Sequence, residues 1–575
     1  MGKGGRVHRL MSGHPVRRAG GVALSFLCGI IGSALLSAQD LPTPTVPDPS
    51  DLKIRGEVRL TADFYGLDAD ASALFSPRRP SSLFRLSLTP VITAGEFSLP
   101  ITLLVSSEQT NVTTPRVASP SLSQFVQNRA NRLTLSPSYK WARLDLGTWT
   151  PRYSALTTGN QALFGAGIDL TPGPVRVAFF YGSAQAAIEP DSAAGITGAF
   201  ARQALTSRVA IGDRETTQFG LNMVRVADDT GSIAPQVAGG LVPTEGTTLS
   251  ADVRLRFVEK LTIDGEIAGS AFTRNLRSDV VEDAEIVSAL ITPRESTRLD
   301  YGGRLGVTWN EPIWGASLVG RYLGDGFRPL GYPYAQSDLA ELTLSPRLSL
   351  FEHRLQLNGS LGYRVDNLQQ TSAATTSRLV GIVSGTGRIT DNFTLSASYA
   401  NAGFASVFDE DTLKIRTISE SFSLAPVLML RDSTAIHTIT LALTGSDFVE
   451  ENTLTSLASI NDMIGINGSW SLALQRTPLR GTLSFGYTRN NLPLGALATL
   501  GGSIGASLRL LKGKVRPSLR FSWNQNGIEG NDPDNRIGVR GGIAWRIFDR
   551  LTLQTEGSVI HHRYGTLRPD ASYTE

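Results

Sequence analysis

The strongest constraint on this chain is an alternation of apolar and polar residues that repeats from Leu52 almost to its end. In Lys514–Trp523 every second residue is apolar, and Glu341–Leu350 follows the same rule. Successive residues of a β-strand point to opposite faces, so this alternation predicts strands with one apolar and one polar face. Helical periodicity of useful length is missing after residue 38. The sequence therefore predicts an all-β fold.

Tight turns and longer loops alternate between these segments. Twelve tight turns are predicted near Gly95, Lys140, Pro172, Asp213, Glu259, Glu311, His353, Asp391, Asp432, Pro478, Gly513 and Asp549. Twelve longer loops are predicted near residues 65–81, 109–129, 151–161, 187–202, 228–246, 274–297, 325–337, 366–376, 403–414, 448–459, 491–498 and 526–535. A tight turn joins two antiparallel strands as a hairpin, so we expect about 25 strands in hairpin order.

A sheet with so many strands has to be arranged so that it has no long free edges. A single open sheet of this size is excluded by strand twist and exposed edges, which leaves a closed barrel or a propeller. A propeller repeats a four-stranded signature, which this sequence lacks. Short turns at one rim and long loops at the other are typical of transmembrane barrels, whose tilted strands cross the hydrocarbon with about 9–11 residues. We expect one antiparallel up-and-down transmembrane β-barrel of about 24–26 strands.

The pattern resembles the bacterial outer-membrane β-barrel proteins along the whole chain after residue 38. Phe164–Gly182, with the sequence FGAGIDLTPGPVRVAFFYG, is similar to the large, porin-like, uncharacterised members of that group. The resemblance implies a location in the cell outer membrane and insertion by the outer-membrane assembly machinery. It also implies contact with lipid and lipopolysaccharide, and with possible protein partners in the envelope.

The first residues have the composition of an export signal. Residues 1–38 hold five basic residues and no acid, and an apolar run extends from Val22 to Leu36. That run is short for a membrane helix, and small residues follow it, so we predict a cleaved signal peptide at 1–38. A membrane anchor is the alternative. A Pro-rich periplasmic leader is predicted at 39–51 and the barrel at 52–575.

The other end of the chain departs from the expected pattern. Outer-membrane barrels usually finish on a strand with a terminal aromatic residue, whereas Arg568–Glu575 is polar and loop-like. The alternation of turns and loops gives an odd strand number, although such barrels have even numbers. We therefore expect the closing strand to be missing at the C-terminus, either because the sequence is truncated or because something else completes the barrel.

Residue types that carry catalysis or bind cofactors are sparse. Cys28, the only cysteine, lies within the predicted signal peptide, and the histidines after residue 38 show no zinc-site spacing. The sequence contains no phosphate-binding glycine loop and no convincing serine–histidine pair. A formal net charge of +3 over 575 residues gives no nucleic-acid signature. We predict no enzyme activity, no metal and no cofactor.

The polar face of the strands is the candidate site. Alternation places the following residues toward the lumen: Arg143, Asp145, Arg254, Arg256, Glu341, Arg347, Arg509, Arg516 and Arg520. Charged rings in a lumen set ion preference, and the excess of arginine favours anions. The alternative is that arginine–carboxylate pairs simply fill and stiffen the interior. A register slip of one residue would reverse every assignment.

Two functions remain open from the sequence. The first is a porin-like channel for passive passage of small solutes. A barrel of this size is wider than a porin, so long outer loops, especially 109–129, 187–202 and 274–297, are expected to fold inward and restrict it. The second is a non-conducting scaffold or secretion-associated barrel that binds partner proteins. Bilayer conductance separates the two functions.

Overall fold

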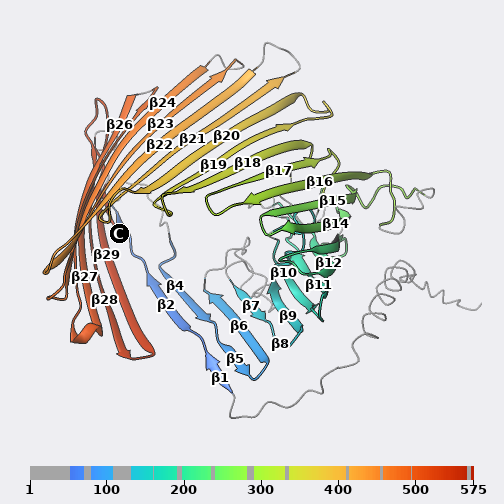
Figure 1. Cartoon of the computed structure of the whole chain (residues 1–575), viewed down its shortest axis with the longest axis horizontal. Coiled ribbons are helices and arrows are strands. Elements are labelled where there is room, and N and C mark those ends of the chain that lie inside the picture. The colour runs from blue at the N-terminus through green and yellow to red at the C-terminus, as the bar shows by residue number, and fades with distance from the viewer. Residues whose placement is uncertain are drawn as a thin grey trace, which may run out of the picture.

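The computed structural model shows one antiparallel sheet that wraps around to meet itself (Figure 1). It describes residues 52–69, 79–107, 131–159, 161–190, 197–234, 240–281, 291–329, 336–408, 414–453, 457–493, 495–565 and 572–575. The predicted signal peptide and leader, and most of the predicted loop 109–129, lie outside these residues. No helix in the described ranges is long and apolar enough to cross a membrane.

The sheet contains 30 strand segments. The first fifteen are β1 (Lys53–Arg55), β2 (Val58–Phe64), β3 (Asp68–Ala69), β4 (Ser82–Leu88), β5 (Val91–Ala94), β6 (Phe97–Ser106), β7 (Arg132–Leu135), β8 (Ser138–Tyr139), β9 (Ala142–Trp149), β10 (Leu163–Leu170), β11 (Val175–Gln185), β12 (Ala201–Gly212), β13 (Gln218–Asp229), β14 (Glu245–Val258) and β15 (Leu261–Thr273).

The remaining segments are longer on average. They are β16 (Thr297–Asn310), β17 (Trp314–Leu323), β18 (Leu339–Leu350), β19 (Leu355–Asp366), β20 (Ala374–Arg388), β21 (Phe393–Phe408), β22 (Lys414–Arg431), β23 (Ala435–Asn452), β24 (Leu457–Leu474), β25 (Leu479–Leu492), β26 (Gly495–Leu508), β27 (Val515–Ile528), β28 (Asp534–Phe548), β29 (Leu551–Arg563) and β30 (Ser572–Thr574). Within the described ranges, a 3-10 turn lies at Leu511–Gly513.

The predicted all-β fold is confirmed, and every tight turn named above separates two strands that pair with each other. Three of the predicted strands are interrupted: β1–β3, β4–β5 and β7–β8 each follow one path across the sheet. Counting each interrupted strand once gives 26 strands in the described part of the chain. This number agrees with the predicted 24–26.

Several predicted outer loops are shorter than expected because the strands before them continue. β21 runs to Phe408, β23 to Asn452 and β27 to Ile528, inside segments that the sequence assigned to loops. The ends of β23 and β27 are rich in polar residues such as Glu450, Glu451 and Gln525, and a strand above the hydrocarbon layer needs no apolar face. For these two strands, alternation detects the part that lipid covers and misses the part in water. The end of β21, Phe404–Phe408, is mostly apolar and does not follow this explanation.

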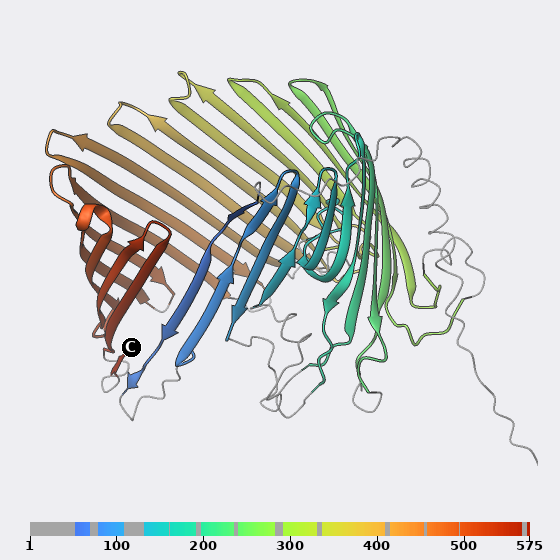
Figure 2. The ribbon, with the colours of Figure 1, turned by 90° about the horizontal axis from the view of Figure 1, so that it is seen from below.

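Closure of the ring depends on β30. Neighbouring strands pair in chain order from β4 to β29, and the three-residue β30 then pairs antiparallel with both β29 and β3. The loop-like C-terminus predicted from the sequence thus contains a strand, although a short one. Figure 2 shows the red end of the sheet and the blue β1–β3 path lying near each other at the C-terminus and spreading apart toward the rim of tight turns.

Candidate functional site

The two faces of the sheet differ sharply in chemistry. On one face of β9–β18, large apolar side chains are exposed, including those of Leu144, Ile168 and Leu221. On the opposite face of the same strands, polar and charged side chains such as Asp145 and Glu266 are buried. Exposed apolar residues around a closed antiparallel ladder match the requirements of lipid, which can neither hydrate polar side chains nor satisfy free backbone groups. The polar face is the lumen.

The loop between β9 and β10 folds onto this inward face. The Glu266 carboxylate on β15 accepts the backbone N–H groups of Ala155, at 2.9 Å, and of Leu156, at 3.2 Å. The Ser250 hydroxyl on β14 contacts Ser154 at 3.5 Å. A carboxylate bound to backbone N–H groups makes charge-assisted hydrogen bonds, which are stronger than neutral ones. These contacts attach the loop to strands far along the sheet from its own.

Arg208 on β12 holds the same loop from a second side. Its guanidinium donates to the Tyr153 carbonyl at 2.9 Å and to the Asp252 carboxylate at 2.6 and 3.0 Å. It also donates to Asn222 and to Gln218. The Arg208 side chain is only 4% exposed, so its charge depends on these partners for compensation. Burial raises the pKa of the Tyr153 phenol in this loop to about 12.

A second loop, between β17 and β18, meets the first. Its Gly326 N–H donates to Asp300 on β16 at 2.7 Å, and its Arg328 N–H donates to Ser270 on β15 at 3.1 Å. Phe327 of this loop and Leu156 of the β9–β10 loop are buried in one apolar cluster. Two loops from separate hairpins thus lie on the inward face and contact the wall and each other, which places a constriction inside the barrel.

Arginine–carboxylate pairs cross the wall around this constriction. Arg143 and Arg176 both contact Asp169, at 2.9 and 2.7 Å. Further pairs join neighbouring strands: Arg202 with Asp228 at 2.7 Å, Arg304 with Asp264 at 2.5 Å, and Arg321 with Glu341 at 2.6 Å. Each pair neutralises most of its own charge, so this part of the wall is polar without a strong net field.

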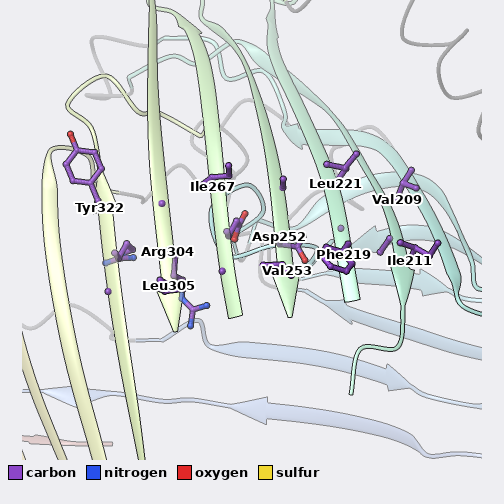
Figure 3. Close-up of a pocket in the computed structure, with 18 of the residues that line it drawn as sticks. Val209, Ile211, Phe219, Leu221, Asp252, Val253, Ile267, Arg304, Leu305 and Tyr322 are labelled. Carbon is purple, nitrogen blue, oxygen red and sulfur yellow. The ribbon is translucent and has the colours of Figure 1, made fainter. Parts of the chain in front are cut away.

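The outward face carries an apolar groove of about 920 Å³ across β12–β18 (Figure 3). Ile211, Phe219, Leu221, Ile267 and Leu305 lie along it. Outward glycines on β15, β16 and β17 deepen it because they place no side chain there: Gly265, Gly303 and Gly320. The groove belongs to the lipid-facing surface, and its residues separate the exterior from the charged pairs on the other side of the same strands.

No family model and no curated protein matches the sequence. Among solved structures, a P pilus tip assembly intermediate of E. coli (PapC-PapD-PapK-PapG) matches 88% of this chain and 62% of its own, with 11% identity and a TM-score of 0.46. The P pilus usher (PapC) translocation pore matches 86% of this chain and 95% of its own, with 10% identity and a TM-score of 0.33. The Acinetobacter baumannii protein OccAB3 matches 64% and 97%, with 11% identity and a TM-score of 0.28.

These likenesses are too distant to carry function, and the strand pairing and the apolar exterior decide the class. The chain folds as an antiparallel β-barrel. Its strands form a ladder that β30 joins into a ring, with an apolar exterior and a polar lumen, which is the arrangement found in membrane-spanning barrels.

The predicted lumen residues fall into two groups. Arg143, Asp145 and Glu341 lie in the paired wall beside the constriction. The others are exposed or near the rim of tight turns. Arg254 and Arg256 lie in the last five residues of β14, and Arg347 on β18 donates to the Glu311 carbonyl in the β16–β17 turn. Arg516 and Arg520 lie on β27, and Arg509 follows the last residue of β26.

The sequence did not single out the constricting loop. Only parts of the predicted segments 187–202 and 274–297 lie within the described residues; there, Phe200 clusters with Ile233, and the Leu276 N–H donates to the Pro243 carbonyl. In the part of the chain that the structure describes, the loops that reach the inward face are 151–161 and 325–337, both of which the sequence placed among ordinary outer loops. Arg208 and Asn222 were also missed. Their strand positions gave the only available signal, because both share the inward parity of their strands.

Proposed function

We propose that the protein is a porin-like channel for passive passage of small solutes across the outer membrane. The observation that carries the proposal is the β9–β10 loop, which Glu266 and Arg208 hold on the inward face. A barrel with more strands than the 16–18 of porins encloses a wider lumen, and an unrestricted opening would admit large molecules. A pinned loop narrows that lumen while leaving a water-filled path.

The chemistry of the lumen supports small polar solutes as the cargo. The wall opposite the constriction has a polar depression of about 610 Å³, lined by Asn467, Ser484, Ser503, Arg520 and Asn524 among other residues. Hydroxyl, amide and guanidinium groups replace part of the hydration shell of a passing solute without binding it tightly. Export of the chain depends on the predicted signal peptide, which is part of the same proposal.

Conductance of the purified protein in a planar lipid bilayer tests the channel. We expect discrete open steps for the wild type. Glu266→Ala removes the acceptor that holds Ala155 and Leu156, so the single-channel conductance should rise and the current should become noisier. Glu556→Ala is the matched control, because Glu556 is an exposed inward carboxylate on β29.

Absence of conductance from the correctly folded wild type would overturn the channel. It would favour the second candidate, a scaffold that binds envelope proteins through its loops or lumen. If Glu266→Ala and the wild type have equal conductance, the protein is still a channel, but the β9–β10 loop is not its constriction.

A further inference from the structure

A polar cavity of about 360 Å³ lies on the inward face beside the β17–β18 loop. Arg328 of this loop lines the cavity, whereas the preceding Phe327 packs in the constriction. Phe272, which also lines it, follows Glu266 along β15 toward the loops, so the cavity lies on the loop side of the constriction. Its volume falls within the roughly 300–1,000 Å³ that is typical of small-molecule sites.

One wall of this cavity is positively charged. Arg274 follows the last residue of β15, Arg298 lies on β16, and Arg328 belongs to the β17–β18 loop. All three residues are exposed, and in the described part of the chain none of their guanidinium groups forms an ion pair. Arg328 lies over the Phe272 ring, 5.9 Å from its centroid. Since guanidinium groups bind carboxylates through paired hydrogen bonds, this wall can accept a carboxylate.

The wall formed by β18–β20 carries carboxylates. Asp338 precedes β18 and Asp366 is the last residue of β19. One oxygen of each accepts a backbone N–H, from Leu368 to Asp338 at 2.9 Å and from Thr376 to Asp366 at 2.7 Å. The other oxygen of each carboxylate has no hydrogen-bond partner among the described residues. Each carboxylate is thus held in place and keeps an oxygen that can accept a hydrogen bond from an ammonium group.

The sheet itself keeps these two walls apart. Neighbouring strands lie roughly 4.7–4.9 Å apart, so the backbones of β16 and of β18–β19 are separated by distances on the order of 10–15 Å. With Asp325 on the β17–β18 loop, three arginines and three aspartates line the cavity, which therefore has no formal net charge. Opposite charges on separate walls complement a solute with one charge of each sign better than they complement a simple anion.

We propose that this cavity binds a short peptide with free ends, an inference that rests on the proposed channel and specifies its cargo. The C-terminal carboxylate binds the arginine wall, and the N-terminal ammonium binds Asp338 and Asp366. Both ends are charged at neutral pH. An extended residue spans about 3.3–3.6 Å, so two or three residues separate the charges by a distance that the side chains of both walls can bridge.

Hydroxyl groups on the aspartate side of the cavity support a peptide as the ligand. Ser337, Thr371 and Ser372 line the cavity, and within the described ranges their hydroxyls make no hydrogen bond. A hydroxyl can both donate and accept, so these groups can bind the N–H and C=O groups of a peptide bond. A single amino acid has no peptide bond, and its two charges lie too close together to reach both walls.

Saturation-transfer difference NMR tests the site, because it detects weak binding and requires no conductance. The probe is trialanine, titrated into the full chain in detergent micelles. Two derivatives each lack one charge: N-acetyl-trialanine has no ammonium group, and trialanine amide has no carboxylate. We expect the wild type to bind trialanine about fivefold or more tightly than either derivative, and more tightly than free alanine, because only trialanine reaches both walls with a charge.

Two substitutions assign the two ends of the peptide. Arg298→Gln removes one guanidinium, so it should weaken the binding of trialanine and leave that of trialanine amide unchanged. Asp366→Asn keeps an acceptor for the Thr376 N–H but has no charge, so it should weaken the binding of trialanine and leave that of N-acetyl-trialanine unchanged.

Arg546→Gln on β28 is the matched control. Arg546 is an exposed arginine without an ion pair in the described part of the chain, and it lies near the rim of tight turns, away from the cavity. This variant should bind all the probes as the wild type does. The gel mobility of the unheated barrel shows whether each variant is folded.

The proposal is overturned if the folded wild type does not bind trialanine, or binds it no more tightly than its derivatives. Free alanine that binds as tightly as trialanine would overturn the peptide in favour of an amino acid. Equal effects of Arg298→Gln and Arg546→Gln would place binding outside the cavity. Trialanine binding by a protein that does not conduct would keep the site and remove the channel, whereas conductance without trialanine binding would do the reverse.

Discussion

Arg208 shows how one buried charge can hold both the wall and the constriction. Its guanidinium binds Asp252 through two hydrogen bonds and the Tyr153 carbonyl through a third. Arg208→Ala should lower the free energy of unfolding by about 3–5 kcal/mol, because Asp252 is left without its counter-charge. Urea unfolding of the protein in lipid vesicles measures this loss.

The matched control for that measurement is Arg540→Ala. Arg540 and Glu556 form a pair whose side chains are 57% and 54% exposed, so its loss should change the unfolding free energy by less than about 1 kcal/mol. Equal effects of the two substitutions would contradict the assigned role of Arg208.

Asp432 should make the stability of the protein depend on pH, because of its hydrogen bonds within one turn. In the β22–β23 turn its carboxylate accepts hydrogen bonds from the Thr434 hydroxyl and from the N–H groups of Thr434 and Ala435. The Thr434 bonds, followed by the Ala435 bond, lower the pKa of Asp432 from 3.8 to about 2. A lowered carboxyl pKa contributes stability above the unfolded value, and this contribution disappears as pH falls from about 4 to about 2.

Asp432→Asn keeps an acceptor but does not titrate. The stability difference between wild type and Asp432→Asn should therefore be constant above pH 5 and shift in favour of Asp432→Asn between about pH 4 and 2. Urea midpoints collected across this range measure the shift. A difference that stays constant down to pH 2 would show that the carboxylate does not hold the turn.

At the scale of the strands, Gly147 on β9 is a position where the neighbouring strand's backbone comes so close that only glycine fits. Its φ is +90°, and an added Cβ would collide with the Leu133 carbonyl oxygen on the neighbouring path of β7. Gly147→Ala should therefore lower the free energy of unfolding by about 2 kcal/mol or more, since a positive φ alone costs about 1–2 kcal/mol for residues with a Cβ. Gly481→Ala, with open space around its added methyl, should have little effect in the same urea titration.

The sequence predicted the positions of the tight turns well, but it predicted poorly which loops fold inward. A tight turn such as Asp432–Thr434 is encoded locally, because its own side chains satisfy its backbone. The inward fold of Tyr153–Thr158 depends on Glu266 and Arg208, which lie far along the chain. Local composition does not determine which distant strand a loop contacts.

For the whole molecule, unpaired arginines predict a weak preference for anions. Arg516 and Arg520 are exposed on β27, and within the described ranges neither forms an ion pair. The reversal potential in a salt gradient should therefore indicate anion selectivity, and the double substitution Arg516→Glu, Arg520→Glu should reverse or abolish it. Arg550→Glu in the β28–β29 turn, which makes the same charge change as either one of these substitutions, is the control for position. Cation selectivity of the wild type would contradict the prediction.

The sequence alone determined that this chain forms an antiparallel barrel with an apolar exterior, because lipid imposes the same period-two rule on every strand that crosses it. It also located the tight turns, whose chemistry is local. Only the tertiary structure decided which loop enters the lumen, which arginines are neutralised by carboxylates, and how β30 joins β29 to β3. These features depend on contacts between residues that lie from under ten to several hundred positions apart in the chain, which alternation does not encode.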